Sequence, residues 1–301
     1  MELTSGQVAV VTGGGSGIGL ALADRLGAAG LNLVLADVQD DALAAAEHVG
    51  AHGVDVLTVR TDVSKHDEVE ALAARTLERF GAVHVVCNNA GVAPRGDAWF
   101  GPLSSWEWVM GVNFWGVVHG CRTFLPHLAG GGHIVNTASM AGLMPGFAPS
   151  YDASKHAVVA ISEDLYNTVR LAGLPIGVSV LCPGWVRTRI VEADRNWPPE
   201  LGELPQDDPA LAVVIEHFRR AIDEGSQPAF VADAVADAIA ADRFWVIPHQ
   251  DFLDLVVQRW ETIADRADPD PPEHMPGMPP RSQVMAEVMA ALGLQPAEGA
   301  P

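Results

Sequence analysis

The fold of this chain is decided by the stretch Val8-Ala9-Val10-Val11-Thr12-Gly13-Gly14-Gly15-Ser16-Gly17-Ile18-Gly19. Its first five residues predict a buried strand, and the helical run Leu20-Ala21-Leu22-Ala23 follows the glycines at once. A glycine-rich turn between a strand and a helix lets the backbone approach a pyrophosphate and directs the helix N-terminus at its charge. The stretch therefore predicts a dinucleotide site. Its cofactor-binding residues would be Gly13, Ser16, Gly17, Ile18 and Gly19.

An acidic residue closes the second predicted strand. Asp37 follows Gly19 by 18 residues, a position where a carboxylate can accept hydrogen bonds from both hydroxyls of an adenosine ribose. The same carboxylate would repel a 2′-phosphate, and neither Ser16 nor Val38 offers a cation to bind one. We therefore predict NAD rather than NADP as the cofactor.

Asp62 and Val63 follow the third predicted strand, and two interpretations of them stay open. Asp62 could lie near the adenine amino group, with Val63 as an apolar wall beside the ring. Alternatively, Asp62 is an ordinary helix cap, because a helix is predicted to begin at Lys65.

Short apolar runs alternate with longer Ala-rich stretches from Gln7 to Pro248. This rhythm is typical of βαβ units and a parallel sheet. We therefore expect an α/β fold of the Rossmann type, a doubly wound, seven-stranded parallel sheet with helices on both faces. The predicted strands are Val8–Thr12, Leu31–Ala36, Val54–Thr61, Val83–Asn88, His133–Thr137, Gly177–Cys182 and Phe244–Ile247. The predicted helices are Gly17–Ala29, Asp40–Val49, Lys65–Phe80, Ser104–Leu128, Tyr151–Leu171 and Val231–Ala241.

Two segments depart from this rhythm. Residues 189–228, here called the lid, are acidic and contain prolines, and a short helix is expected around Pro209–Glu224. Residues 251–301 form an acidic, Pro-rich helical extension with helix-like stretches at Phe252–Ala264 and Ser282–Leu292. We expect a catalytic domain over residues 1–250. The extension would either pack on a neighbouring subunit or stay partly mobile.

Composition limits the possible partners. The chain has 18 Lys and Arg residues and 38 Asp and Glu residues, which gives a formal net charge of -20. This charge repels phosphate backbones and anionic lipids. We therefore expect neither nucleic acid nor a membrane as a partner. Cys87, Cys121 and Cys182 lack disulfide or metal spacing, and His48 and His52 lack a third ligand, so no metal site is expected. Without a targeting segment, the expectation is a cytoplasmic protein.

The segment Tyr151-Asp152-Ala153-Ser154-Lys155 carries the predicted chemistry. On a helix the i,i+4 spacing places the phenol and the ammonium on one face. A free phenol has a pKa of about 10, and a neighbouring cation lowers it toward the range of a useful base. Upstream, Ser139 ends a predicted strand, where its hydroxyl could hydrogen-bond a substrate oxygen while Tyr151 moves the proton.

With these motifs in order along the chain, the sequence resembles the short-chain dehydrogenase/reductase family. The matching residues are the Thr12–Gly19 turn, Asn88-Asn89-Ala90-Gly91, Asn113, Ser139, Tyr151-x-x-x-Lys155, and Pro183-Gly184 with Thr188. Together they span about Gln7 to Pro248. The resemblance implies hydride transfer between nicotinamide and a secondary alcohol or ketone, and a homodimer or homotetramer.

The resemblance also implies individual roles. Tyr151 would be the general acid/base. Lys155 would lower the pKa of the Tyr151 hydroxyl and bind the nicotinamide ribose. Ser139 would hydrogen-bond the substrate oxygen. Asn113 would hold a water that links Lys155 to solvent. The other cofactor-binding residues would be Asn89 and Gly91 on the adenosine side, Pro183 and Gly184 at the turn, and Val186 and Thr188 near the carboxamide and phosphates.

The substrate is predicted less closely. Three aromatic residues are candidate substrate contacts. Phe147 is close to Ser139 in the sequence, Trp185 follows the Pro183-Gly184 turn, and Trp197 belongs to the lid. The tail resembles those of actinobacterial family members and of Cα-dehydrogenases that act on lignin-derived aryl ethers, which favours aromatic secondary alcohols. An epimerase or dehydratase and a nicotinamide-binding regulator without net turnover are the alternatives.

Overall fold

A seven-stranded parallel sheet forms the centre of the computed structural model, which describes residues 1–146 and 148–294. The strand order is β3-β2-β1-β4-β5-β6-β7, and every neighbouring pair is parallel. The strands are β1 (Val8–Thr12), β2 (Asn32–Asp37), β3 (Val56–Arg60), β4 (Val85–Asn88), β5 (Gly132–Thr137), β6 (Ile176–Leu181) and β7 (Trp245–Val246). The predicted Rossmann-type fold is confirmed.

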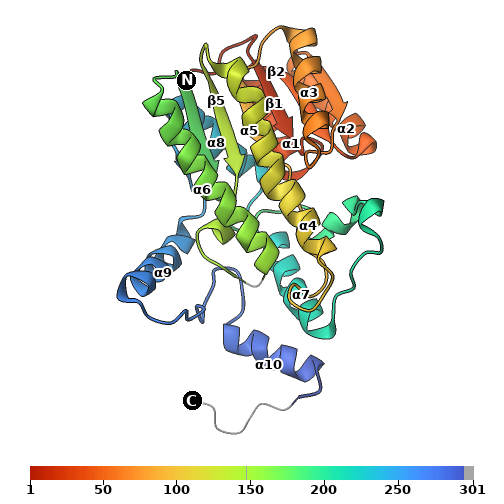
Figure 1. Ribbon diagram of the computed structural model, residues 1–301, viewed down its shortest axis with the longest axis vertical. Coiled ribbons are helices and arrows are strands. Elements are labelled where there is room, and N and C mark those ends of the chain that lie inside the picture. Colours follow the sequence, from red (N-terminus) through yellow and green to blue (C-terminus); the bar gives the residue numbers. More distant parts are fainter. Residues whose placement is uncertain (147, 295–301) are drawn as a thin grey trace.

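Helices cover both faces of this sheet (Figure 1). They are α1 (Gly17–Ala28), α2 (Asp40–Ala46), α3 (His66–Phe80), α4 (Ser104–Met110), α5 (Gly116–Phe124), α6 (Pro149–Leu171), α7 (Pro209–Asp223), α8 (Pro228–Ala241), α9 (Leu253–Asp265) and α10 (Arg281–Ala291). No helix among the described residues has both the length and the apolarity needed to cross a bilayer.

Alternating residues of the buried strands divide the core into two parts. Ala9 and Val11 of β1 pack in the cluster that contains α1 and α8, whereas Val8 and Val10 pack in the cluster that contains α3 and α5. A strand that is apolar at every position is what a sheet covered on both faces requires. The glycine turn after β1 is thus held between two packed layers.

The predicted long helix Ser104–Leu128 is interrupted. A π-helical turn, η2 (Gly111–Trp115), separates α4 from α5, and a short 3₁₀ turn, η3 (Leu125–Leu128), ends the run. Such π turns often occur at functional positions. This one contains Asn113, which is fully buried.

The lid and the C-terminal segment pack on the chain itself. Two 3₁₀ turns, η5 (Ile190–Asn196) and η6 (Pro199–Leu201), precede α7 in the lid. The C-terminal helix α10 lies against α7, and His217 and Glu287 join them at 2.7 Å. The Trp185 Nε1 donates to the carbonyl oxygen of Pro276 at 2.6 Å. Figure 1 shows α7 and α10 together, beyond one end of the sheet.

Substitution of Gly120 tests how closely α5 packs on the sheet. A Cβ at this position would overlap the side-chain oxygen of Asn88, whereas a Cβ on Gly130 would meet nothing within 4 Å. We expect Gly120→Ala to lower the free energy of unfolding by about 1–3 kcal/mol, the usual penalty of overpacking a core. Urea titration should show this loss in Gly120→Ala but not in the control Gly130→Ala. Equal stability of the two variants would contradict it.

Candidate active site

A cavity of about 750 Å³ runs along the carboxyl ends of the strands. Residues at or just after the carboxyl ends of β1, β2, β4, β5 and β6 line it, among them Gly13, Asp37, Asn89, Ser139 and Pro183. The order of the strands reverses at β1, which lies between β2 and β4. Ligands of open α/β sheets bind at such a switch point, outside the carboxyl ends of the strands.

The glycine turn approaches the next loop so closely that side chains do not fit. Gly13 has φ 63°, and a Cβ on it would lie 2.9 Å from the Cα of Ala90. A Cβ on Gly19 would overlap the carbonyl oxygen of Gly13. Gly17 has φ 55° and lies beneath Thr188, whose Cγ2 would be 3.1 Å from an added Cβ. This backbone cradle fits the pyrophosphate of a dinucleotide.

The carboxylate of Asp37 is fixed beside this cradle. Its Oδ2 accepts a hydrogen bond from the Gly15 amide at 3.1 Å, and its Oδ1 accepts one from the Gln39 amide at 3.2 Å. Asp37 also lines the cavity. Each carboxylate oxygen retains accepting capacity for a ribose hydroxyl, because it has two lone pairs.

Asp62 and Val63 both line the cavity, and Asp62 also has a local structural role. Its Oδ1 accepts from the amide and the hydroxyl of Ser64, at 3.0 and 2.7 Å, and Lys65 Nζ lies 3.4 Å from its Oδ2. The turn before α3 is stabilised in this way. Asp62 is not the helix cap, because Lys65 is the N-cap residue of α3 and no side chain caps this helix. The adenine interpretation stays a prediction.

Thr12 connects β1 to the loop after β4. Its hydroxyl accepts from the amides of Asn89 and Ala90 at 3.0 and 3.1 Å, and the Asn89 Nδ2 donates to the Thr12 carbonyl at 3.0 Å. Asn89 and Gly91 line the cavity as a result. A Cβ on Gly91 would be 3.5 Å from Lys155 Nζ, which places this loop against the ammonium.

Helix α6 brings Tyr151 and Lys155 onto one face. The Lys155 Nζ lies 5.5 Å from the centre of the Tyr151 ring and donates to the Thr137 carbonyl at 2.9 Å. Lys155 is only 3% exposed, and this burial lowers its pKa to about 8. The ammonium is held at the end of β5, one helical turn from the phenol.

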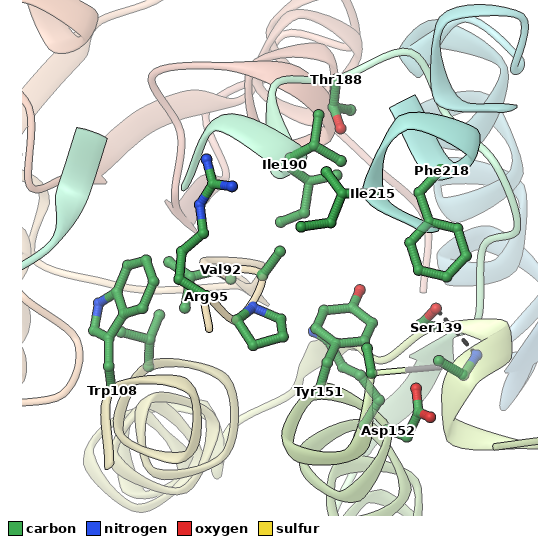
Figure 2. Close-up of a pocket in the computed structure, with 18 of the residues that line it drawn as sticks. Val92, Arg95, Trp108, Ser139, Tyr151, Asp152, Thr188, Ile190, Ile215 and Phe218 are labelled. Atoms are coloured by element: carbon green, nitrogen blue, oxygen red, sulfur yellow. Dashed lines mark hydrogen bonds between the residues drawn. The ribbon is translucent and has the colours of Figure 1, made fainter. Parts of the chain in front are cut away.

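The hydroxyls of Tyr151 and Ser139 face the same space (Figure 2). Burial raises the pKa of Tyr151 to about 12, and the hydrogen bond with Ser139 opposes that rise. The Ser139 Oγ also accepts from the Ala141 amide at 3.1 Å, which fixes its rotamer. An oxygen bound between these two hydroxyls would meet both a proton donor and an acceptor.

Asn113 lies behind this pair rather than in the cavity wall. Its Oδ1 accepts from the Val92 amide at 2.8 Å, and its Nδ2 donates to the Val92 carbonyl at 3.0 Å and to Ser154 Oγ at 3.2 Å. It thus ties the loop after β4 to α6. The predicted water relay remains a prediction.

The other predicted site residues fall into three groups. Ser16, Ile18, Pro183, Gly184, Trp185, Val186 and Thr188 line the cavity. Gly19 and Trp197 are not among its lining residues. Trp197 instead packs edge-on against Trp108, with ring centres 5.1 Å apart, and donates to the Gly202 carbonyl at 2.9 Å. Phe147 lies outside the described residues.

Sequence reasoning gave a substrate contact to the lid through Trp197 but did not name the residues that form the apolar half of the cavity. It is lined by Ile190 of the lid, by Leu211, Val214, Ile215, Phe218 and Ile222 of α7, and by Met275, Val284, Met285 and Val288 of the C-terminal segment. Figure 2 shows Ile190, Ile215 and Phe218 on the side opposite Tyr151. The helical spacing of the α7 residues was a usable signal, because a stripe at i, i+3, i+4 and i+7 marks a helix with one buried face.

Asp152 was also missed, although it follows Tyr151 directly. It lines the cavity but is only 7% exposed, and its Oδ2 accepts from the Gly146 amide at 2.7 Å. Burial raises the pKa of this carboxyl to about 6, while the hydrogen bonds from Gly146 and Ala148 oppose the rise. The carboxylate therefore holds the loop after β5 at an energetic cost.

The charge on Asp152 predicts a pH-dependent stability. The folded pKa of about 6 exceeds the ordinary 3.8, so the folded chain binds this proton more tightly. The resulting stabilisation is complete below about pH 4 and is lost as the pH rises through 6. We expect Asp152→Asn, which cannot ionise, to gain about 2 kcal/mol over the wild type between pH 4 and 7.

Urea titrations at several pH values measure this difference in the free energy of unfolding. Asp254→Asn removes one carboxylate from an exposed position on α9 and is the control. Parallel pH profiles of the wild type and Asp152→Asn would contradict the prediction.

Known proteins resemble this chain in sequence and in fold. A family model described as short chain dehydrogenase matches residues 7–199. The 1-deoxy-11-beta-hydroxypentalenate dehydrogenase of Streptomyces avermitilis is 40% identical over 255 residues, covering 81% of this chain and 85% of that protein. A short-chain dehydrogenase/reductase from Burkholderia phymatum, solved in complex with NAD, has a TM-score of 0.88 and 42% identity, covering 91% of this chain and 100% of that one.

LigO from Sphingobium sp. strain SYK-6 is a further structural neighbour. Its apo form has a TM-score of 0.72 and 33% identity, covering 88% of this chain and 90% of that one. These likenesses extend past the family-model match into the lid and beyond. They confirm the resemblance predicted from the sequence.

Proposed function

The chain belongs to the short-chain dehydrogenase family of NAD(P)-dependent oxidoreductases, and from that premise we propose that it interconverts a secondary alcohol and a ketone with NAD. The observation that carries this proposal is the joint position of Ser139, Tyr151 and Lys155. Two hydroxyls face one space in the cavity, and a buried ammonium lies beneath the phenol.

In this proposal Tyr151 moves the proton. During alcohol oxidation its phenolate accepts the hydroxyl proton of the substrate, while Ser139 donates a hydrogen bond to the same oxygen. A phenol with a pKa of about 12 needs added positive charge to ionise near neutral pH. Lys155 supplies that charge when protonated. The oxidised nicotinamide, when bound, supplies the hydride acceptor.

Asp37 supports NAD as the preferred cofactor. Its carboxylate is fixed by two backbone amides at the end of β2, in the position expected for the adenosine ribose. A 2′-phosphate there would meet this negative charge. The Burkholderia phymatum relative was solved with NAD, which agrees with the proposal.

The apolar walls support a hydrophobic substrate. Phe218 and Ile215 face Tyr151 from α7, and Val288 of α10 extends this wall. A substrate whose carbonyl reaches Ser139 would bury its remaining carbon skeleton against these side chains. Aromatic or polycyclic secondary alcohols would suit such a pocket, and the similarity to the 1-deoxy-11-beta-hydroxypentalenate dehydrogenase supports an apolar substrate.

The proposed chemistry is tested by following NADH absorbance with purified protein, NAD or NADP, and a panel of aliphatic, benzylic and steroidal secondary alcohols. We expect turnover with apolar alcohols and NAD. In Tyr151→Phe we expect kcat to fall by about 10²- to 10⁴-fold, because the general base is lost. Retained NAD binding and thermal stability are the controls. Cofactor binding without turnover on any alcohol or ketone would favour the regulator alternative.

A larger side chain at Val288 tests whether α10 forms an apolar wall of the substrate pocket. Val288 lines the cavity, whereas Ala286 on the same helix is exposed and does not. We expect Val288→Trp to raise KM for bulky alcohols at least about tenfold, the effect of losing or blocking a few buried methylenes. Small alcohols and the NAD dissociation constant should change little, and Ala286→Trp should resemble the wild type. Equal KM changes for small and bulky alcohols would contradict an α10 wall.

A further inference from the structure

The lid contains four arginines, and three of them pair with acids of the lid itself. Arg189 pairs with Glu192 at 2.7 Å, and Arg219 and Arg220 pair with Glu216 at 3.7 and 3.2 Å. Among the described residues, no carboxylate lies within 4.0 Å of the Arg195 guanidinium. In a chain with a formal net charge of -20, this unpaired cation needs an explanation.

The hydrogen bonds of Arg195 satisfy only part of its guanidinium. The Nη1 donates to the carbonyls of Arg189 and Glu192 at 2.9 and 2.7 Å. The Nε is buried and has no hydrogen-bond partner in the described structure. Burial lowers the pKa of Arg195, and the charge of Arg189 adds to this effect. A buried N–H without a partner is unfavourable, so a missing acceptor is indicated.

The position of Arg195 shows which acceptor is missing. Arg195 lines the cavity together with Ser16 and Gly17 of the glycine turn. Thr188 directly precedes the lid, and its Cγ2 would lie 3.1 Å from a Cβ added at Gly17, so the lid begins close to that turn. The negative charge of Asp37 also acts on Arg195 and raises its pKa. The guanidinium therefore lies on the dinucleotide side of the cavity.

The lid backbone around Arg195 is fixed without any ligand. Its neighbour Asp194 pairs with Arg95 at 2.9 Å, and Arg95 also binds Asp207 at 2.6 Å. Both Arg95 and Asp207 are 18% exposed, so the pairs are largely shielded from water. Arg95 thus anchors two points of the lid to the loop after β4. A guanidinium held in this way loses little entropy when it binds an anion.

We propose that Arg195 binds a phosphate oxygen of the dinucleotide and so makes the lid part of the cofactor site. This inference rests on the nicotinamide dinucleotide of the proposed function. The free Nε–H belongs to a planar fork whose geometry matches a phosphate. The anion would complete the hydrogen bonding of the guanidinium and offset its desolvation.

The test measures cofactor affinity in the absence of substrate. Arg195→Gln removes the charge and leaves a shorter polar side chain. The matched control is Arg220→Gln, which removes an exposed lid arginine that pairs with Glu216 and does not line this cavity. We expect Arg195→Gln to weaken NAD and ADP-ribose at least about tenfold by calorimetry, the loss of one charge-assisted hydrogen bond. Adenosine, measured by competition, should bind equally to all three proteins. Arg220→Gln should resemble the wild type.

NADP distinguishes the two possible phosphates. If Arg195 binds the pyrophosphate, Arg195→Gln weakens NAD and NADP by the same factor. If it binds the 2′-phosphate, only NADP is weakened, and phosphate binding still holds. Unchanged affinity for every nucleotide, or an equal loss for adenosine, would overturn the proposal and leave Arg195 as a structural brace of η5.

Two further points keep the test interpretable. Thermal unfolding shows whether the variants fold, and Arg195→Lys, which keeps the charge but not the fork, should bind NAD with intermediate affinity. Wild-type affinity in Arg195→Lys at high salt would contradict a direct guanidinium contact. These titrations require no turnover, so failure to oxidise any alcohol would not affect them.

Discussion

The close approach of two backbone turns, at Gly13 and at Ala90, is the constraint on which this structure depends. Parallel pairing of β1 with β4 brings the two turns together, and the Thr12 hydroxyl joins them through the amides that follow β4. No side chain fits between them. The cradle for a pyrophosphate and the loop that contacts Lys155 are therefore parts of one backbone arrangement.

Much of this arrangement could be predicted from local sequence. Each strand is a short apolar run, the glycines follow the first strand, and Tyr151 and Lys155 are separated by one helical turn, so spacing alone brings them together. Strand ends were predicted to within about two residues in most cases, because β-branched runs end at polar or glycine residues. The order of the strands was not predicted, because a strand's own sequence does not show which strands lie beside it.

The rest depends on which surfaces meet, and spacing does not encode that. The long helix was predicted without its π turn, because no proline or cap marks Gly111. Trp197 was predicted to reach substrate but packs behind Trp108. The pairing of α7 with α10 joins residues about 70 positions apart, through His217 and Glu287. Amphipathic helices show that they bury a face, but not which partner covers it.

The cover formed by α7 and α10 is separate from the core that stabilises the sheet. Apart from Phe252 and Val284, the cavity-lining residues of the C-terminal segment are partly exposed, and the two main core clusters contain neither helix. Substitutions in this cover therefore perturb the sheet and the glycine turn little. A lineage could exchange one set of apolar side chains there for another while cofactor binding and folding are preserved. The same scaffold can in this way acquire new substrates by small, independently tolerated steps.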